Sequence, residues 1–174
     1  MRRHVCGWAG ACALLIALAV TGPAAAQKSG GVLKISFFDS PASMSLHEEA
    51  TGSALRPMMG VFNNLVMYDQ QQAQNRPDTI VPDLAESWSW DSTNTRLTFK
   101  LRQGVKWHDG QPFTAKDVQC TWRMLIGKTE TQDFKRNPRK VWYTKLQDVS
   151  VNGDYEATFE LSEPQPSLPV LLAS

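Results

Sequence analysis

Alternation of apolar and polar residues, together with short apolar runs, predicts β-strands along much of the chain. The predicted strands cover residues 32–38, 87–90, 97–101, 105–108, 149–151 and 155–161. Turn-forming residues stand between them, and the cluster 91–95, Asp109-Gly110 and Asn152-Gly153 each favour a chain reversal. The pattern therefore indicates antiparallel hairpins.

Helical spacing of apolar residues predicts a helix over 53–66, and the polar stretch 69–78 after it is expected to be a loop. Pro57 is expected in the first turn of this helix, where the N–H that proline lacks has no partner in any case. A last helix is expected to begin at Ser167, and the apolar run that follows leads us to expect a chain that is cut short.

The strongest local signal frames a helix that begins after Thr114 and ends at Gly127. Thr114 and Asp117 stand at the N-cap and N3 positions of a capping box, with Asp in place of the usual Glu. Phe113 and Val118 occupy the two positions of a hydrophobic staple, and glycine is the residue best suited to end a helix. Together with the strands, this helix predicts a mixed α/β fold.

Residues 1–26 have the three parts of a secretory signal peptide. A basic start precedes an apolar stretch over 9–20, and small residues at 24–26 fit a cleavage site before Gln27. This stretch is too short to cross a membrane, which takes about 20 residues. Arg2-Arg3 leaves open whether export follows the general or the twin-arginine route.

Composition and charge exclude some classes of function. The chain carries 18 Lys and Arg against 17 Asp and Glu, so no strongly basic character indicates a nucleic-acid partner. Removing residues 1–26 takes away Cys6 and Cys12, and the remaining Cys120 cannot form an internal disulfide. We therefore predict a bacterial periplasmic protein without a disulfide framework.

Residue types for catalysis or metal binding do not cluster in the sequence. His47 and His108 lie far apart and are interpreted as a loop and a turn residue, so no metal site is expected. No nucleophile motif is found, and Gly127-Lys128-Thr129 lacks the first glycine of a phosphate-binding loop. Cys120 is expected to be a buried apolar residue of its helix. We therefore expect neither enzyme activity nor a cofactor.

Five tryptophans follow the predicted signal peptide. Four lie on predicted elements and are expected to be core residues: Trp88, Trp90, Trp107 and Trp122. Trp142 follows the loop 137–141 instead, and is therefore the one that we consider for a cleft.

A long and specific motif covers residues 81–118, which read VPDLAESWSWDSTNTRLTFKLRQGVKWHDGQPFTAKDV. It resembles the signature region of the family 5 extracellular solute-binding proteins, the periplasmic receptors of ABC importers for peptides, nickel complexes and related solutes. Three further pieces support the resemblance: GGVLKIS at 30–36, FNNLVMYD at 62–69 and NPRKVWY at 137–143. Family members are several times longer, so the chain resembles only their N-terminal part.

The resemblance implies a type II periplasmic-binding-protein fold, a two-lobed clamshell that closes on its ligand by hinge bending. Residues 27–45 are then expected to start lobe I, and residues 46–161 to form most of an extra inserted α/β domain. Residues 162–174 are expected to return toward lobe I, and lobe II would lie outside the chain.

In this family the loop after the first strand lines the ligand cleft, and the NPRKVWY piece resembles a segment that can approach the ligand. The resemblance therefore implies five candidate ligand contacts: Phe38, Asp39, Ser40, Met44 and Trp142. Many members carry an Asp-Pro pair shortly after the loop, where this chain has Ser45-Leu46. This departure leaves the shape of the loop open.

The function implied by the resemblance is that of a non-catalytic component of an ABC importer. It captures short peptides in the periplasm and delivers them to permease subunits at the inner membrane, as a monomer without cofactor, metal or nucleic acid. A receptor for a metal chelate, an opine or an oligosaccharide is the alternative. A secreted hydrolase with its site beyond residue 174 is the hypothesis from another class.

Overall fold

The computed structural model describes residues 30–32, 34–129 and 137–173. The chain divides into two compact units, residues 1–36 and residues 37–174. The predicted signal peptide lies outside the described residues, as do residues 130–136.

The prediction of a strand over residues 32–38 is wrong. The described residues of this segment form no strand, and the side chains of Val32, Ile35 and Phe38 are exposed. A strand is stable only beside a partner strand and a covered face. Neither of the two sheets in the described part of the chain includes this segment, so its apolar pattern alone does not make it a strand.

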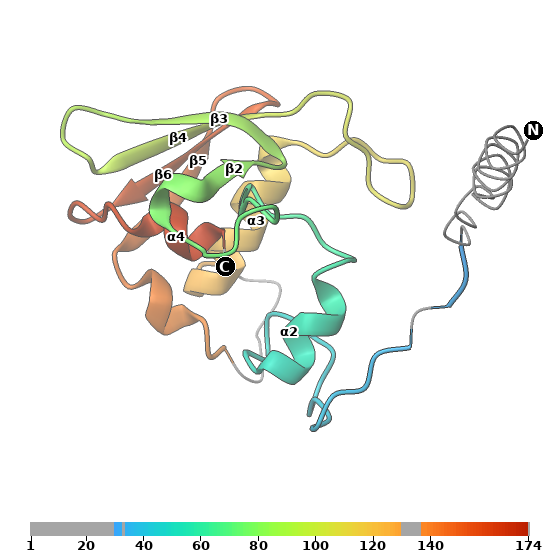
Figure 1. The fold of residues 1–174 in the computed structure, drawn as a ribbon. Coiled ribbons are helices and arrows are strands. Elements are labelled where there is room, and N and C mark those ends of the chain that lie inside the picture. Colours follow the sequence, from blue (N-terminus) through green and yellow to red (C-terminus); the bar gives the residue numbers. More distant parts are fainter. Residues whose placement is uncertain (1–29, 33, 130–136, 174) are drawn as a thin grey trace, which may run out of the picture. The chain divides into compact units, whose positions relative to one another are not determined.

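A four-stranded antiparallel sheet dominates the second unit (Figure 1). Its strands stand in the order β3-β4-β6-β5, with β3 at Ala85–Trp90, β4 at Arg96–Leu101, β5 at Leu146–Val151 and β6 at Glu156–Leu161. The hairpins predicted around 91–95 and Asn152-Gly153 are confirmed. The pairing of β4 with β6 joins them, and the hydroxyl groups of Thr98 and Thr158 lie 2.9 Å apart across this pair.

The core lies between this sheet and helix α3 (Ala115–Ile126), which runs below the sheet in Figure 1. Alternate residues of the two central strands face this core, so that Leu97, Phe99 and Phe159 are fully buried. The Phe159 ring meets Phe99 edge-on with centroids 5.4 Å apart, and meets Trp122 of α3 at 5.0 Å. Burying each such side chain contributes about 1.5–3 kcal/mol.

Helix α3 begins and ends where the sequence predicts. Thr114 is its N-cap residue, and the Thr114 N–H donates to the Asp117 carboxylate at 2.7 Å. Gly127 ends the helix in the left-handed region with φ 77°, which a residue without Cβ adopts at low cost. Phe113 and Val118 are both buried, as a hydrophobic staple requires.

Helix α2 (Gly52–Met58) is shorter than the helix predicted over 53–66, and Pro57 lies near its end instead of in its first turn. Because Pro57 has no N–H, it cannot donate to the carbonyl one turn earlier, and the helix extends only one residue further, to Met58. Residue 66 belongs instead to β1 (Val66–Tyr68), which pairs with β2 (Ile80–Pro82) in a separate antiparallel sheet.

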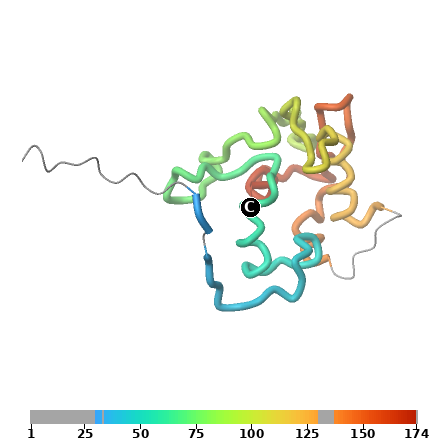
Figure 2. The backbone as a smooth tube through the Cα atoms, turned by 90° about the vertical axis from the view of Figure 1, so that its right-hand side faces the viewer, coloured from blue at the N-terminus to red at the C-terminus, as the bar shows by residue number. Residues whose placement is uncertain are grey.

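The remaining elements are short. The 3-10 helices η1 and η2 cover Pro77–Thr79 and Lys140–Tyr143, and helix α4 covers Leu168–Leu172. Helix α4 confirms the helix expected after Ser167, although the Ser167 side chain makes no cap hydrogen bond. It packs beside β1 (Figure 2). No helix in the described part of the chain has the length and apolar character that spanning a bilayer requires.

Two further predictions need correction. Residues 105–108 form no strand; the pairing there is limited to an isolated bridge between Lys106 and Pro112 around the turn at Gly110. Cys120 is exposed and not buried. It lies two residues after the buried Val118, a rotation of roughly 200° about the helix axis, which places its side chain on the opposite face of α3.

Candidate functional site

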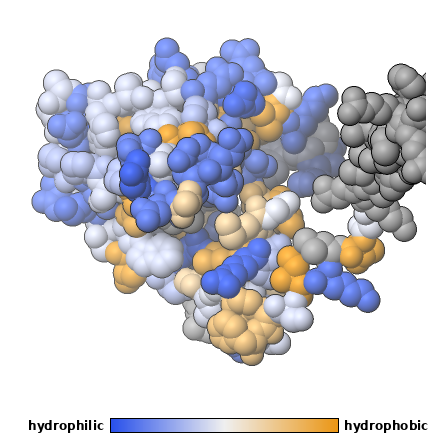
Figure 3. Space-filling model, viewed as in Figure 1, coloured by the Kyte–Doolittle hydropathy of each residue, from blue (hydrophilic) through white to orange (hydrophobic). Residues whose placement is uncertain are grey.

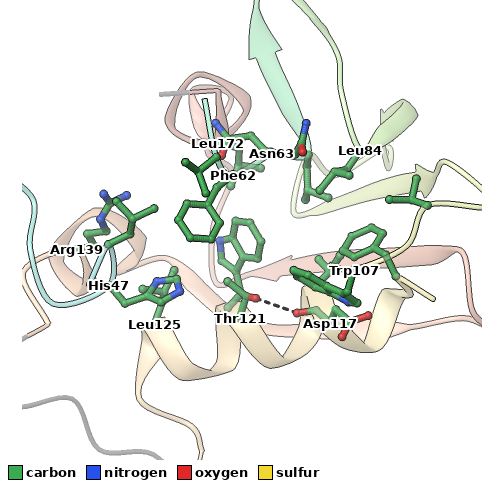
Figure 4. A pocket seen from close by; sticks show the side chains of 18 of the residues that line it. His47, Phe62, Asn63, Leu84, Trp107, Asp117, Thr121, Leu125, Arg139 and Leu172 are labelled. Atoms are coloured by element: carbon green, nitrogen blue, oxygen red, sulfur yellow. Dashed lines mark hydrogen bonds between the residues drawn. The ribbon is translucent and has the colours of Figure 1, made fainter. Parts of the chain in front are cut away.

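A cavity of about 600 Å³ lies beside α3 (Figure 4). Its lining comes from α3, from α4 and from the segments 44–47, 61–65 and 105–108, together with Leu84, Phe113, Arg139 and Tyr143. In Figure 3, exposed hydrophobic residues gather on the part of the surface that carries α2, whereas the surface over the sheet is mostly hydrophilic. Three large apolar side chains that line this cavity are about half exposed: Met44, Val61 and Phe62.

The wall of the cavity formed by α3 is apolar because of the spacing of residues along that helix. Val118, Trp122 and Leu125 follow one another at intervals of four and three residues, so they share one face of the helix. Thr121 lies on the same wall, and its hydroxyl donates to the Asp117 backbone carbonyl at 2.9 Å. The wall therefore offers a ligand mainly apolar contact.

The two ends of the cavity differ in chemistry. In Figure 4, Arg139 and His47 lie at one end, Trp107 and Asp117 lie toward the other, and Phe62 stands between them. The Asp117 carboxylate accepts the Thr114 N–H and is therefore committed to capping α3. Arg139 supplies the positive charge at its end, and Lys106, next to Trp107 in the chain, also lines the cavity.

Arg139 is the least satisfied polar group of the cavity. Its Nε and Nη2 atoms are buried and have no hydrogen-bond partner. Burial lowers the pKa of Arg139 from its ordinary value, and burial also raises the pKa of the neighbouring Tyr143. The pKa of His47 is lowered, first by burial and then by the charge of Arg139. His47 is therefore held neutral more readily than a free histidine, and Arg139 dominates the charge at this end.

The segment that carries Phe62 over the cavity is held by Asp83. The Asp83 carboxylate accepts the Asn63 side-chain amide at 3.0 Å and the Asn64 backbone N–H at 2.9 Å. These bonds join Asn63 and Asn64, which follow α2 in the chain, to Asp83, which lies two residues before the start of β3. The chain directly after Phe62 is therefore fixed to the segment that leads into β3.

The five candidate contacts that the sequence named do not come together. Met44 lies on the cavity, with half of its side chain exposed. Phe38, Asp39 and Ser40 form an exposed bend away from the lining, where the Asp39 carboxylate accepts the Ser40 N–H at 2.8 Å. Trp142 does not line the cavity, but its ring lies 5.5 Å from the Arg139 guanidinium carbon. As ligand contacts, all five stay predictions.

Sequence reasoning missed Arg139 and misjudged Trp107. Trp107 was expected in the core, but 45% of it is exposed and it lies at the cavity, edge-on to Phe113 with ring centroids 5.8 Å apart. The other three expected core tryptophans pack against the core as predicted. Arg139 stands in the quoted NPRKVWY piece, three residues before Trp142, and this spacing was the signal available.

His47 and His108 both line the cavity, one in the turn after Ser45 and the other in the turn before Gly110. The turn position predicted for His108 is thus confirmed. Within the described ranges, no group of three or more His, Cys, Asp or Glu side chains is placed to hold a metal ion.

The residues that form the four-stranded sheet, α3 and α4 also identify the protein family. Residues 79–174 match the family model of the bacterial extracellular solute-binding proteins, family 5, middle region. The chain belongs to this family. The murein peptide-binding protein MppA of Escherichia coli K12, which is named as periplasmic, is 29% identical over 145 residues, or 80% of this chain and 25% of MppA.

Solved structures of similar proteins show the same fold. MoaA of A. tumefaciens R10, in complex with mannopinic acid, has 30% identity and a TM-score of 0.63, over 75% of this chain and 25% of MoaA. NikA of Brucella suis, in complex with Fe(III)-EDTA, has 28% identity and a TM-score of 0.53, over 65% of this chain and 20% of NikA. The fold is that of part of a type II periplasmic binding protein.

The matched relatives are solute-binding proteins and not enzymes. The chain spans about a fifth to a quarter of the length of the curated relatives that it matches. Several of these curated relatives, from Brucella, are named as putative peptide-binding proteins of ABC transporters.

Proposed function

We propose that the chain is part of a periplasmic solute-binding protein that captures short peptides and delivers them to ABC importer permeases. The observation that carries this proposal is the family match over residues 79–174, which includes the whole four-stranded sheet and α3. The signal peptide expected over 1–26 supports a periplasmic location, and residues 46–161 are proposed to form the inserted domain. We propose that the complete protein is monomeric and has no catalytic activity.

Peptides are the proposed ligand because the E. coli relative that covers most of the chain is named for binding a murein peptide. A receptor for another small solute is the second candidate. It is favoured by the two solved relatives, whose ligands are mannopinic acid and Fe(III)-EDTA. Met44 and Trp142 are the candidate contacts nearest to the cavity, and we propose that they contribute to its solute-facing side.

Native mass spectrometry of the full-length protein, purified gently from the periplasmic fraction, tests this proposal. A series of bound short-peptide masses is expected. One bound non-peptide mass would replace peptides by the second candidate. A protein that carries no bound ligand, and that also binds no peptide when peptides are added, would contradict the peptide assignment. Recovery of the processed chain in the cytoplasmic fraction would contradict the proposed location.

A further inference from the structure

His47 and Arg139 line the same end of the cavity, and Arg139 stands on a segment that is fixed to α3 (Figure 4). The Asn137 side-chain amide donates to the Leu125 carbonyl at 2.8 Å, which ties this segment to the last turn of the helix. The Trp142 ring lies 5.5 Å from the guanidinium carbon of Arg139. The positive charge of Arg139 therefore has a fixed place in the cavity wall.

His47 stands on a segment that is held in a different way. Its turn is closed by the Ser45 carbonyl, which accepts the Glu48 N–H at 3.2 Å and the Glu49 N–H at 3.0 Å. Both bonds lie within the turn itself. Residues 44–47 line the cavity from this turn, and they can move relative to α3 without breaking either bond.

The charge of His47 changes in a pH range where the charge of Arg139 does not. Histidine titrates between about pH 5 and pH 8, whereas arginine stays protonated throughout that range. The pKa of His47 is lowered from 6.5, first by burial and then by the charge of Arg139. At neutral pH the pair therefore carries one positive charge, and in acid it carries two, which repel each other in a partly buried place.

The other titratable groups of the cavity do not reverse this change. Among the described residues, those that line the cavity together with His47 are Lys106, His108, Asp117, Arg139 and Tyr143. Asp117 lies toward the other end and accepts the Thr114 N–H, and burial raises the pKa of Tyr143, so that Tyr143 is neutral in this range. The segment 61–65 and helix α4 line the cavity with side chains that do not titrate.

Two carboxylates follow His47 in its own segment. Glu48 and Glu49 do not line the cavity, and the Glu49 carboxylate accepts the Ala50 N–H at 3.2 Å. Because both belong to the same turn as His47, they travel with it when the turn moves. Protonation of His47 therefore sets this turn, as a unit, against the fixed charge of Arg139.

We propose that His47 is a pH-sensitive switch, which keeps residues 44–47 against the cavity while it is neutral and drives them away from Arg139 when it is protonated. The cavity is then more open at this end in acid than at neutral pH. The movement is a property of the ligand-free protein. Only the use of this movement to release a transported solute rests on the proposed function.

The test follows the segment by fluorine NMR of the full-length protein. A trifluoromethyl label is attached to the thiol of Met44→Cys in a Cys120→Ser background, since residue 44 is about half exposed. As the pH falls from about 7.5 to about 5, we expect a second label signal to appear below pH 6.5 and to grow. The same label on the native Cys120, on the outer face of α3, should show no second signal.

Three substitutions in the labelled protein identify the groups responsible. His47→Gln should abolish the second signal, because glutamine is polar but takes up no proton. Arg139→Gln should reduce it at least about threefold, because the repelling charge is removed. His108→Gln is the matched control, since His108 also lines the cavity, and it should leave the signal unchanged. A spectrum that does not change with pH, or a second signal that persists in His47→Gln, would overturn the proposal.

Thermal unfolding of the unlabelled proteins separates the movement from a loss of stability. The pKa of His47 is lower in the folded chain than its ordinary 6.5, so acid below that value destabilises the folded state, and His47→Gln should lose less stability there. That smaller loss without a second label signal would overturn the proposed movement. A label that moves with pH, in a protein that captures no peptide, would contradict the proposed function and keep the switch.

Discussion

Arg123 of α3 and Asp148 of β5 form a two-pronged ion pair, with Nε 2.8 Å from Oδ1 and Nη2 3.1 Å from Oδ2. The pair fastens the helix to an edge strand of the sheet, outside the aromatic core. The Lys128 ammonium adds a weaker contact at 4.0 Å. The pKa of Asp148 is lowered, chiefly by its hydrogen bond from Arg123, and the pKa of Arg123 is raised by the same bond.

Asp148→Asn is expected to lower the free energy of unfolding at neutral pH by about 0.5–1 kcal/mol, since both partners are partly exposed. The carboxylate has a lower pKa in the folded than in the unfolded chain, so this stabilisation is present above the ordinary pKa of 3.8 and is lost as the pH falls through the lowered value. Urea unfolding of the unsubstituted protein and of Asp148→Asn, from neutral to acidic pH, should show the difference between their free energies of unfolding shrink to zero. Asp78→Asn, at a more exposed pair, is the control. A difference in free energy of unfolding that persists at acidic pH would contradict this account.

Phe159→Ala is expected to destabilise the protein by about 3–5 kcal/mol, because it removes the ring that Phe99 and Trp122 both contact and leaves a cavity. The matched variant is Phe38→Ala, whose side chain is 91% exposed, and which should change stability by less than about 0.5 kcal/mol. Equilibrium urea unfolding measures both. Similar losses for the two variants would show that the sheet and α3 do not form the core described above.

Gly127→Ala is expected to lower the free energy of unfolding by about 1 kcal/mol or more. The residue has φ 77°, and an added Cβ would also lie 3.0 Å from the Lys140 ammonium. Gly127→Asn should cost less, since Asn tolerates the left-handed region. Gly60→Ala is the control: its surroundings are open and its φ is not positive, so no loss is expected. The three melting temperatures, measured by calorimetry, should follow this order.

Cys120 should react with a maleimide in the native protein, because its side chain is exposed on the outer face of α3. We expect labelling of the native state to approach the rate in urea, with the modified peptide identified by mass spectrometry. Cys120→Ser removes this labelled peptide and serves as the control. Labelling at this position only after unfolding would restore the original interpretation of a buried thiol.

The sequence predicted best those features that short-range chemistry determines. The limits of α3 follow from Thr114, Asp117 and Gly127, which act within one turn of the helix, and the hairpin at Asn152-Gly153 follows from its turn residues. The alternation of Leu97, Phe99 and Leu101 likewise predicted the buried face of β4. Each of these signals is complete within a few residues.

Other features depend on packing between distant segments, which spacing along the chain does not contain. Trp107 has the apolar pattern of a core residue, but the loop that carries it turns it toward the cavity. Arg139 became a candidate only because α3, Asn137 and Trp142 bury and orient it together. The error for Cys120 was avoidable, since the helical rotation from Val118 already places it on the outer face.

The strand order β3-β4-β6-β5 has a consequence for the chain during its synthesis. Strand β4 receives its second neighbour from β6, and Thr98 and Thr158 of this pair are 60 residues apart. At roughly 5–20 residues per second, a ribosome needs several seconds to add that length. During this interval one edge of β4 has no partner, and an open strand edge is a template for pairing with another chain. The nascent chain is therefore most prone to aggregate before β6 emerges.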